Sequence, residues 1–113
     1  MNIFHTDLQK RWKSFSIFEQ MANIGAEVGR MNNWRKKKNR EMSKNAFYRA
    51  LELVDFTVDD PKNKTVLKEI LRMRELLVDY QLGNNIYHSS DRGWDKYFYP
   101  FNLVARNTLP HQP

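Results

Sequence analysis

The stretch Ser16–Lys36, SIFEQMANIGAEVGRMNNWRK, decides the fold of this 113-residue chain. Its start fits a capping box, in which the side chains of Ser16 and Glu19 satisfy the free backbone N–H groups of a helix N-terminus. Apolar residues then recur at helical spacing and form one stripe: Ile17, Met21, Ile24, Val28 and Met31. We therefore expect a long helix that fades within residues 32–39, with Gly25 marking a close approach of another helix.

Three further helices are expected downstream of this one. The second covers about residues 40–59 and ends before Pro61, because the residue before a proline is pushed out of the α region. The third covers about residues 64–82 and is expected to be the most buried, since apolar residues occupy more than half of its circumference. The fourth begins near Ser90 or Asp91 and is expected to be kinked or broken near Pro100, which removes one backbone hydrogen bond.

The length of the chain predicts a single domain over residues 1–113. Residues 1–15 are expected to form an irregular N-terminal arm, and residues 108–113 a frayed tail. Short connections between consecutive helices favour antiparallel neighbours. The predicted fold is therefore all-α, a four-helix up-down bundle.

Composition excludes several kinds of site. The chain has no cysteine, which rules out disulfides and thiolate metal ligands. Its three histidines lie in the head, a loop and the tail, without a second ligand at helical spacing, so we expect no metal and no cofactor. Ser89 and Ser90 beside His88 are better explained as a helix N-cap than as a nucleophile with its base. We therefore expect a protein that is not an enzyme.

The same sequence shows no signal peptide and no apolar run of membrane-spanning length. We expect a cytoplasmic protein without a membrane partner.

Positive charge is concentrated in residues 30–44, where seven Lys or Arg face a single Glu, while the whole chain carries a net charge of +6. Cations of this density neutralise phosphates, and an aromatic ring among them can stack on a base. The candidate nucleic-acid-binding residues are Arg30, Trp34, Arg35, Lys36, Lys37, Lys38, Arg40 and Lys44. The alternative is a solvated connection between two helices, or a contact with an acidic protein surface.

Arg74 falls inside the apolar arc of the third helix, with Gln81 on the same side. A buried guanidinium needs a carboxylate, because an unpaired buried charge is very costly. Glu27, Glu52 and Asp55 are the candidate partners on neighbouring helices. We expect Arg74, Gln81 and Glu27 to be buried polar residues with a structural role, in preference to an anion-binding pocket.

Several stretches resemble a group of short helical prokaryotic proteins of unknown function. They are Ala22–Val28, Ala50–Leu53, Leu67–Ile70, Arg74-Glu75 and Trp94–Phe98. The resemblance spans about residues 12–107 and implies a helical fold and a prokaryotic cytoplasmic setting. It implies no activity and no catalytic residue.

Two functions from different classes are consistent with these features. The favoured one is a non-enzymatic interaction protein that binds a protein partner or itself, as small helical bundles without a catalytic constellation commonly do. The alternative is a helical bundle that binds RNA or single-stranded DNA through residues 30–44, for which a steep dependence of affinity on salt is expected.

Overall fold

The computed structural model describes the backbone of residues 6–108 and the side chains of residues 9–107. Between residues 6 and 108 there is no β-strand, so the predicted all-α class is confirmed. The elements are α1 (Thr6–Arg11), the 3₁₀ helix η1 (Trp12–Ser14), α2 (Ile17–Lys36), α3 (Arg40–Val58), the 3₁₀ helix η2 (Pro61–Val66), α4 (Leu67–Gln81) and α5 (Asp91–Thr108).

Local signals set the starts of the two longest helices. At α2 the predicted capping box is confirmed: the Glu19 N–H donates to Ser16 Oγ at 3.1 Å, and the Ser16 N–H donates to Glu19 Oε1 at 2.9 Å. At α3, Asn39 caps the helix by accepting a hydrogen bond from the Met42 N–H at 3.1 Å. Both caps satisfy donors that a helix N-terminus leaves without partners.

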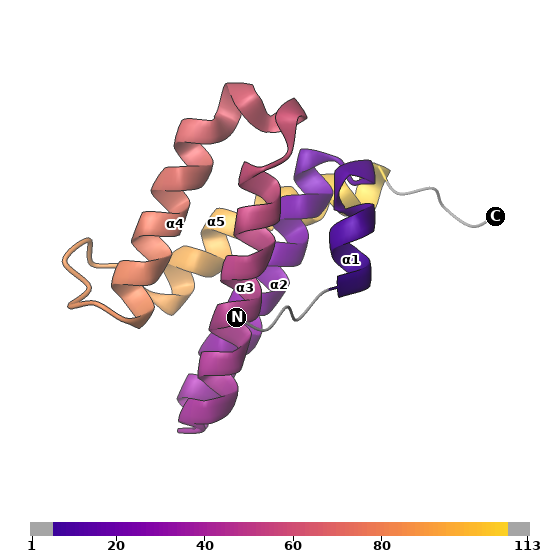
Figure 1. The fold of residues 1–113 in the computed structure, drawn as a ribbon. Coiled ribbons are helices and arrows are strands. Elements are labelled where there is room, and N and C mark those ends of the chain that lie inside the picture. The colour runs from indigo at the N-terminus through magenta and orange to yellow at the C-terminus, as the bar shows by residue number, and fades with distance from the viewer. Residues whose placement is uncertain (1–5, 109–113) are drawn as a thin grey trace.

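Helices α2 and α3 form an antiparallel hairpin, seen as the long central pair in Figure 1. Helix α4 packs on α3, and α5 runs obliquely across α2. At that crossing a Cβ on Gly25 would lie 2.7 Å from Phe98 Cγ, so the expected close helix–helix approach at Gly25 is confirmed. The regular up-down packing of four helices is not established, because α5 lies across α2 and does not run alongside α4.

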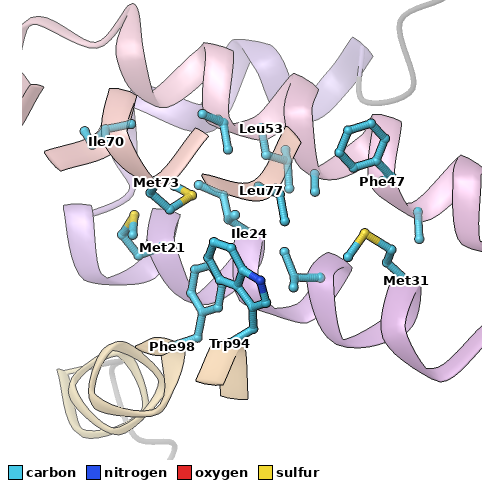
Figure 2. Close-up of a cluster of buried hydrophobic side chains, with 14 of the residues drawn as sticks. Met21, Ile24, Met31, Phe47, Leu53, Ile70, Met73, Leu77, Trp94 and Phe98 are labelled. Carbon is cyan, nitrogen blue, oxygen red and sulfur yellow. The ribbon is translucent and has the colours of Figure 1, made fainter. Parts of the chain in front are cut away.

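The hydrophobic core fills the space where these four helices meet (Figure 2). Methionines are prominent in it, and their flexible side chains fill irregular gaps between helices that cross at different angles. The labelled side chains are each at most 5% exposed: Met21, Ile24, Met31, Phe47, Leu53, Ile70, Met73, Leu77, Trp94 and Phe98.

The predicted irregular arm is wrong for residues 6–14, which form α1 and η1. The reason is Trp12, which is buried and whose Nε1 donates to Thr57 Oγ1 at 3.0 Å, so this segment is fixed against the end of α3. Residues 1–5 and 109–113 lie outside the described part of the chain, and α5 extends to Thr108.

Two expectations about the later helices need correction. Helix α5 is not broken at Pro100, because its apolar face packs on both sides of an exposed proline, and the predicted kink stays a prediction. Helix α4 is not the most buried, since only Ile70, Met73 and Leu77 are fully covered and Leu71 is 46% exposed. It packs one face on α3, while Leu76, Val78 and Tyr80 are only partly buried against the core.

Arg74 is correctly paired but not buried. Its Nε lies 3.0 Å from Asp55 Oδ1, one of the expected partners, yet the Arg74 side chain is 38% exposed because α4 stands at the edge of the fold. Glu27 is buried as expected, and its carboxylate pairs with Arg49 at 3.3 Å and Arg30 at 3.2 Å. Gln81 is half-buried and does not contact Arg74.

A buried polar network joins η1, η2 and the adjoining ends of α2 and α3, and we call it the polar base. Gln20 is its centre: its amide donates to the Trp12 carbonyl and to Asp60 Oδ2, both at 2.9 Å, and accepts from Asn63 at 2.8 Å. The polar base consists of Trp12, Gln20, Thr57, Asp60, Lys62 and Asn63. Because each buried member has a partner, the network fixes one end of the hairpin.

Candidate nucleic-acid interface

The other end of the hairpin is the basic tip, which we define as residues 34–44, from the last turn of α2 to the first turn of α3. It projects below the other helices in Figure 1. Six cations stand on it against Glu41 alone: Arg35, Lys36, Lys37, Lys38, Arg40 and Lys44. Like charges this close together on adjoining helix ends repel one another and weaken the fold.

The turn inside the basic tip places a lysine where glycine is favoured. The Asn39 N–H donates to the Trp34 carbonyl and the Lys38 N–H to the Arg35 carbonyl, both at 2.9 Å. This is a Schellman ending of α2, whose left-handed position Lys38 occupies with φ of 60°. A residue with a Cβ costs about 1–2 kcal/mol in that conformation. Lys38 at this position therefore lowers the stability of the fold.

The basic tip and the end of α4 enclose a pocket of about 560 Å³, which we call the tip pocket. None of the residues that line it is acidic; they are Arg35, Lys38, Arg40, Ser43, Lys44, Gln81 and Leu82. Among the side chains of residues 9–107, no carboxylate pairs with Lys38, Arg40 or Lys44. The pocket is thus a concave, positively charged surface, on which Lys38, Arg40 and Lys44 have no carboxylate partner among the described side chains.

Arg35 is the one cation of the tip pocket that the fold holds in place. Its guanidinium donates to Gln81 Oε1, lies 3.5 Å from Asp91 Oδ1 and sits 4.4 Å from the ring centroid of Tyr80. The Tyr80 hydroxyl donates to the same Asp91 carboxylate. Arg35 therefore joins α2 to the end of α4 and the start of α5, and it presents a preoriented charge to the pocket.

The other predicted residues separate into two groups. Lys36 and Lys37 are exposed on the basic tip but do not line the tip pocket: Lys36 Nζ lies 3.9 Å from Asp91 Oδ2, and Lys37 Nζ lies 5.2 Å above the half-buried Trp34 ring. Arg30 is one turn away from the tip, where it pairs with Glu27. The structure thus brings together Arg35, Lys38, Arg40 and Lys44, and leaves Arg30 and Trp34 outside the pocket.

Sequence reasoning missed the residues that complete this site. Tyr80 and Asp91 anchor Arg35, and Ser43 and Leu82 line the tip pocket. In the sequence, Asp91 has the position of an ordinary helix start, and Tyr80 belongs to an apolar face. No local pattern therefore predicts that the two residues contact Arg35.

A second pocket, of about 290 Å³, lies between α4 and α5 and is mostly apolar. Tyr97 lines it, and burial together with the nearby carboxylate of Glu69 raises the pKa of this tyrosine to about 12. Its phenol therefore stays protonated at neutral pH. Within the described part of the chain, no group of His, Asp or Glu side chains could hold a metal ion, and no helix is long and apolar enough to cross a membrane.

Comparison of the chain with protein-family models, with curated proteins and with solved structures finds no match. The resemblance to short prokaryotic proteins stays a prediction, and the function must be argued from the geometry of the basic tip.

Proposed function

We propose that this protein is a non-enzymatic helical binding protein whose basic tip binds the phosphates of RNA or single-stranded DNA. The observation that carries the proposal is the tip pocket, where four cations line one concave surface that contains no carboxylate. Cations placed in this way neutralise phosphates and release the counterions around them, which is the main source of sequence-independent affinity for nucleic acids.

Two features that destabilise the fold at the basic tip support the same proposal. Crowded like charges and a left-handed Lys38 both weaken the fold. Asp91 offsets the charge of Arg35 and Lys36 only, and Lys38, Arg40 and Lys44 have no carboxylate partner among the described side chains. A bound polyanion would offset both costs. Ser43, a hydroxyl in the lining, donates to the Met31 carbonyl at 2.9 Å, which suits a structural role better than that of a nucleophile.

Charge neutralisation at the basic tip tests the proposal. Lys36, Lys37, Lys38 and Arg40 are changed together to Gln, and binding of a fluorescent single-stranded RNA is followed by anisotropy at low salt. The matched control changes four exposed cations elsewhere, Lys64, Lys68, Arg92 and Lys96, to Gln, which removes the same charge. We expect the tip variant to lose most of its affinity and the control to keep it. Equal losses, or no binding by the parent protein, would contradict the proposal.

Trp34 gives a separate readout of single-strand binding. Its ring stands at the edge of the basic tip under Lys37, where a base could replace the lysine. Trp34→Ala should weaken binding by about 1–3 kcal/mol if the ring stacks on a base. The dependence of affinity on salt should stay the same, because stacking releases no counterion.

A second candidate is docking of a protein partner or of a second copy, the function that the sequence favoured. Exposed large apolar side chains support it: among the described side chains, Leu82, Ile86 and Tyr87 follow one another closely at the end of α4 and in the loop after it. Exposed apolar side chains that lie close together mark interaction surfaces. Light scattering of the parent protein and of an Ile86→Ser variant tests it: a monomer in both cases argues against self-association.

The same proposal puts the protein in the cytoplasm of a prokaryotic cell, as the sequence led us to expect. The absence of cysteine agrees with a reducing compartment.

A further inference from the structure

We propose that the tip pocket takes the 5′-polyphosphate end of an RNA or of a nucleotide, in preference to an internal phosphodiester. This inference rests on the proposed function, because it assigns a ligand group to the same cations. It goes further by naming the part of the nucleic acid that the pocket recognises.

The arrangement of charge favours a terminal group. An extended strand carries one negative charge per phosphate, spaced along its backbone, and is matched by a row of cations along a groove. Here Arg35, Lys38, Arg40 and Lys44 instead surround a single pocket. A terminal polyphosphate concentrates several charges and many acceptor oxygens within one short group, and it can engage these cations together.

The fixed and mobile cations of the tip pocket have complementary uses. Arg35 is held by Gln81 and Asp91, so its planar guanidinium can donate to phosphate oxygens with little further ordering. Lys38 and Lys44 are exposed and without carboxylate partners among the described side chains, although Lys44 Nζ lies 6.0 Å from the Tyr48 ring centroid. Because a lysine stem has many rotatable bonds, both can turn toward the bound group as point charges.

The size and the apolar wall of the tip pocket fit a nucleotide better than a lone phosphate. A volume of about 560 Å³ lies within the range of about 300–1,000 Å³ that small-molecule sites occupy. Leu82 lines the pocket and is 58% exposed, which leaves an apolar surface beside the cations. We assign the cations to the polyphosphate and Leu82 to the sugar or base attached to it.

A comparison of two RNA ends tests this inference. Anisotropy is measured with one short single-stranded RNA carrying either a 5′-triphosphate or a 5′-hydroxyl, and GTP is added as competitor. We expect the triphosphate end to bind at least about tenfold more tightly. Displacement by GTP at equal concentration would identify a free nucleotide as the ligand, and displacement only in large excess would identify the RNA end. Equal affinity for both RNAs would overturn this inference and leave the proposed function standing, whereas no binding of either RNA would overturn both.

Two double variants locate the preference. Lys38→Gln with Lys44→Gln removes two cations that line the tip pocket, and Lys36→Gln with Lys37→Gln removes two neighbours that do not. All four side chains are exposed, so folding is expected to survive and is checked by circular dichroism. We expect only the first pair to abolish the preference for the triphosphate end. An equal reduction of the preference by both pairs would show an undifferentiated basic surface and overturn the inference.

Discussion

The two ends of the α2–α3 hairpin treat polar side chains in opposite ways. At the polar base, Gln20 and Asn63 are buried and each hydrogen-bonds to defined protein partners. At the basic tip, most cations are exposed and the tip pocket has no carboxylate in its lining. The difference indicates that the polar groups of one end stabilise the fold, while those of the other are available to a ligand. Changes at the two ends should therefore affect different measurements.

The largest expected effect on stability is at the polar base. Gln20→Ala removes the donor to the Trp12 carbonyl and Asp60, and the acceptor for Asn63, which leaves buried groups unsatisfied. We expect a loss of about 3 kcal/mol in the free energy of unfolding, measured by urea denaturation. The control is Asn23→Ala on the same helix, where an exposed amide donates to the Glu19 carbonyl and a loss below about 0.5 kcal/mol is expected. Similar losses of unfolding free energy in both variants would show that the buried network stabilises the fold no more than an exposed hydrogen bond does.

Arg35 is the exception at the basic tip, because it also holds three helices together. Arg35→Met keeps an unbranched apolar stem but removes the guanidinium and its interactions with Gln81, Asp91 and the Tyr80 ring. We expect thermal and urea unfolding to show a loss of about 1–2 kcal/mol. Lys37→Met, which removes an exposed cation of the same tip, should leave stability nearly unchanged. If the two variants are equally stable, Arg35 does not anchor the hairpin.

A single change at Lys38 is expected to have opposite effects on stability and on binding. Lys38→Gly places glycine at the left-handed end of α2, where a Cβ is unfavourable. The protein should gain up to about 1 kcal/mol in unfolding free energy and bind single-stranded RNA more weakly. Unfolding and anisotropy on the same preparation check both signs. A less stable variant would contradict the strain assigned to Lys38, and undiminished binding would contradict its role in the pocket.

The smallest expected effect is a pH dependence located at the polar base. Burial alone would raise the pKa of Asp60, but hydrogen bonds from Lys62 and Gln20 and the charge of Lys62 outweigh it and hold this pKa below its ordinary value of 3.8. Ionised Asp60 therefore stabilises the fold at pH values above about 4, and this stability is lost as pH falls through the lowered pKa.

Urea midpoints measured from pH 7 down to acid pH check this dependence. Asp60→Asn should be less stable than the parent at neutral pH and should lose less stability on acidification. Asp59→Asn, a change at the exposed neighbour, should keep the acid dependence of the parent. If the urea midpoints of the parent and of Asp60→Asn fall in parallel as the pH is lowered, the Asp60 carboxylate is not the source of the pH dependence.

How much the sequence predicts depends on whether a signal is local. The capping box at Ser16 and the start of α5 near Ser90 or Asp91 each depend on a few consecutive residues, and both predictions hold in the structure. The concentration of charge in residues 30–44 is a property of the sequence itself, and the structure gathers four of its cations around the tip pocket. The polar base could not be predicted, because its members come from four separate segments and each resembles an ordinary cap or surface residue.

The surroundings of Arg74 and Arg35 could not be predicted for a similar reason. A helical wheel identifies the face on which Arg74 lies, and it correctly points to Asp55, but it does not report that α4 stands at the edge of the fold. Arg35 is one member of a basic run and is equally exposed, at 37%, but it gains its partners Gln81, Tyr80 and Asp91 because α4 ends and α5 begins beside it. Depth of burial is set by the packing of whole helices, which the spacing of residues within one helix does not determine.

The salt dependence of RNA binding tests directly whether the basic tip binds phosphates. It is measured for the parent protein and for the variant with Lys36, Lys37, Lys38 and Arg40 changed to Gln. We expect a steep linear fall of log affinity with log salt for the parent. For the variant we expect a slope that is shallower by up to about 0.7 for each phosphate of a single strand that the protein no longer neutralises. The variant should be at least as stable as the parent, since the removed charges repel one another in the folded protein. Parallel salt slopes, or a parent protein that binds no RNA at low salt, would contradict the assignment of the basic tip to phosphate binding.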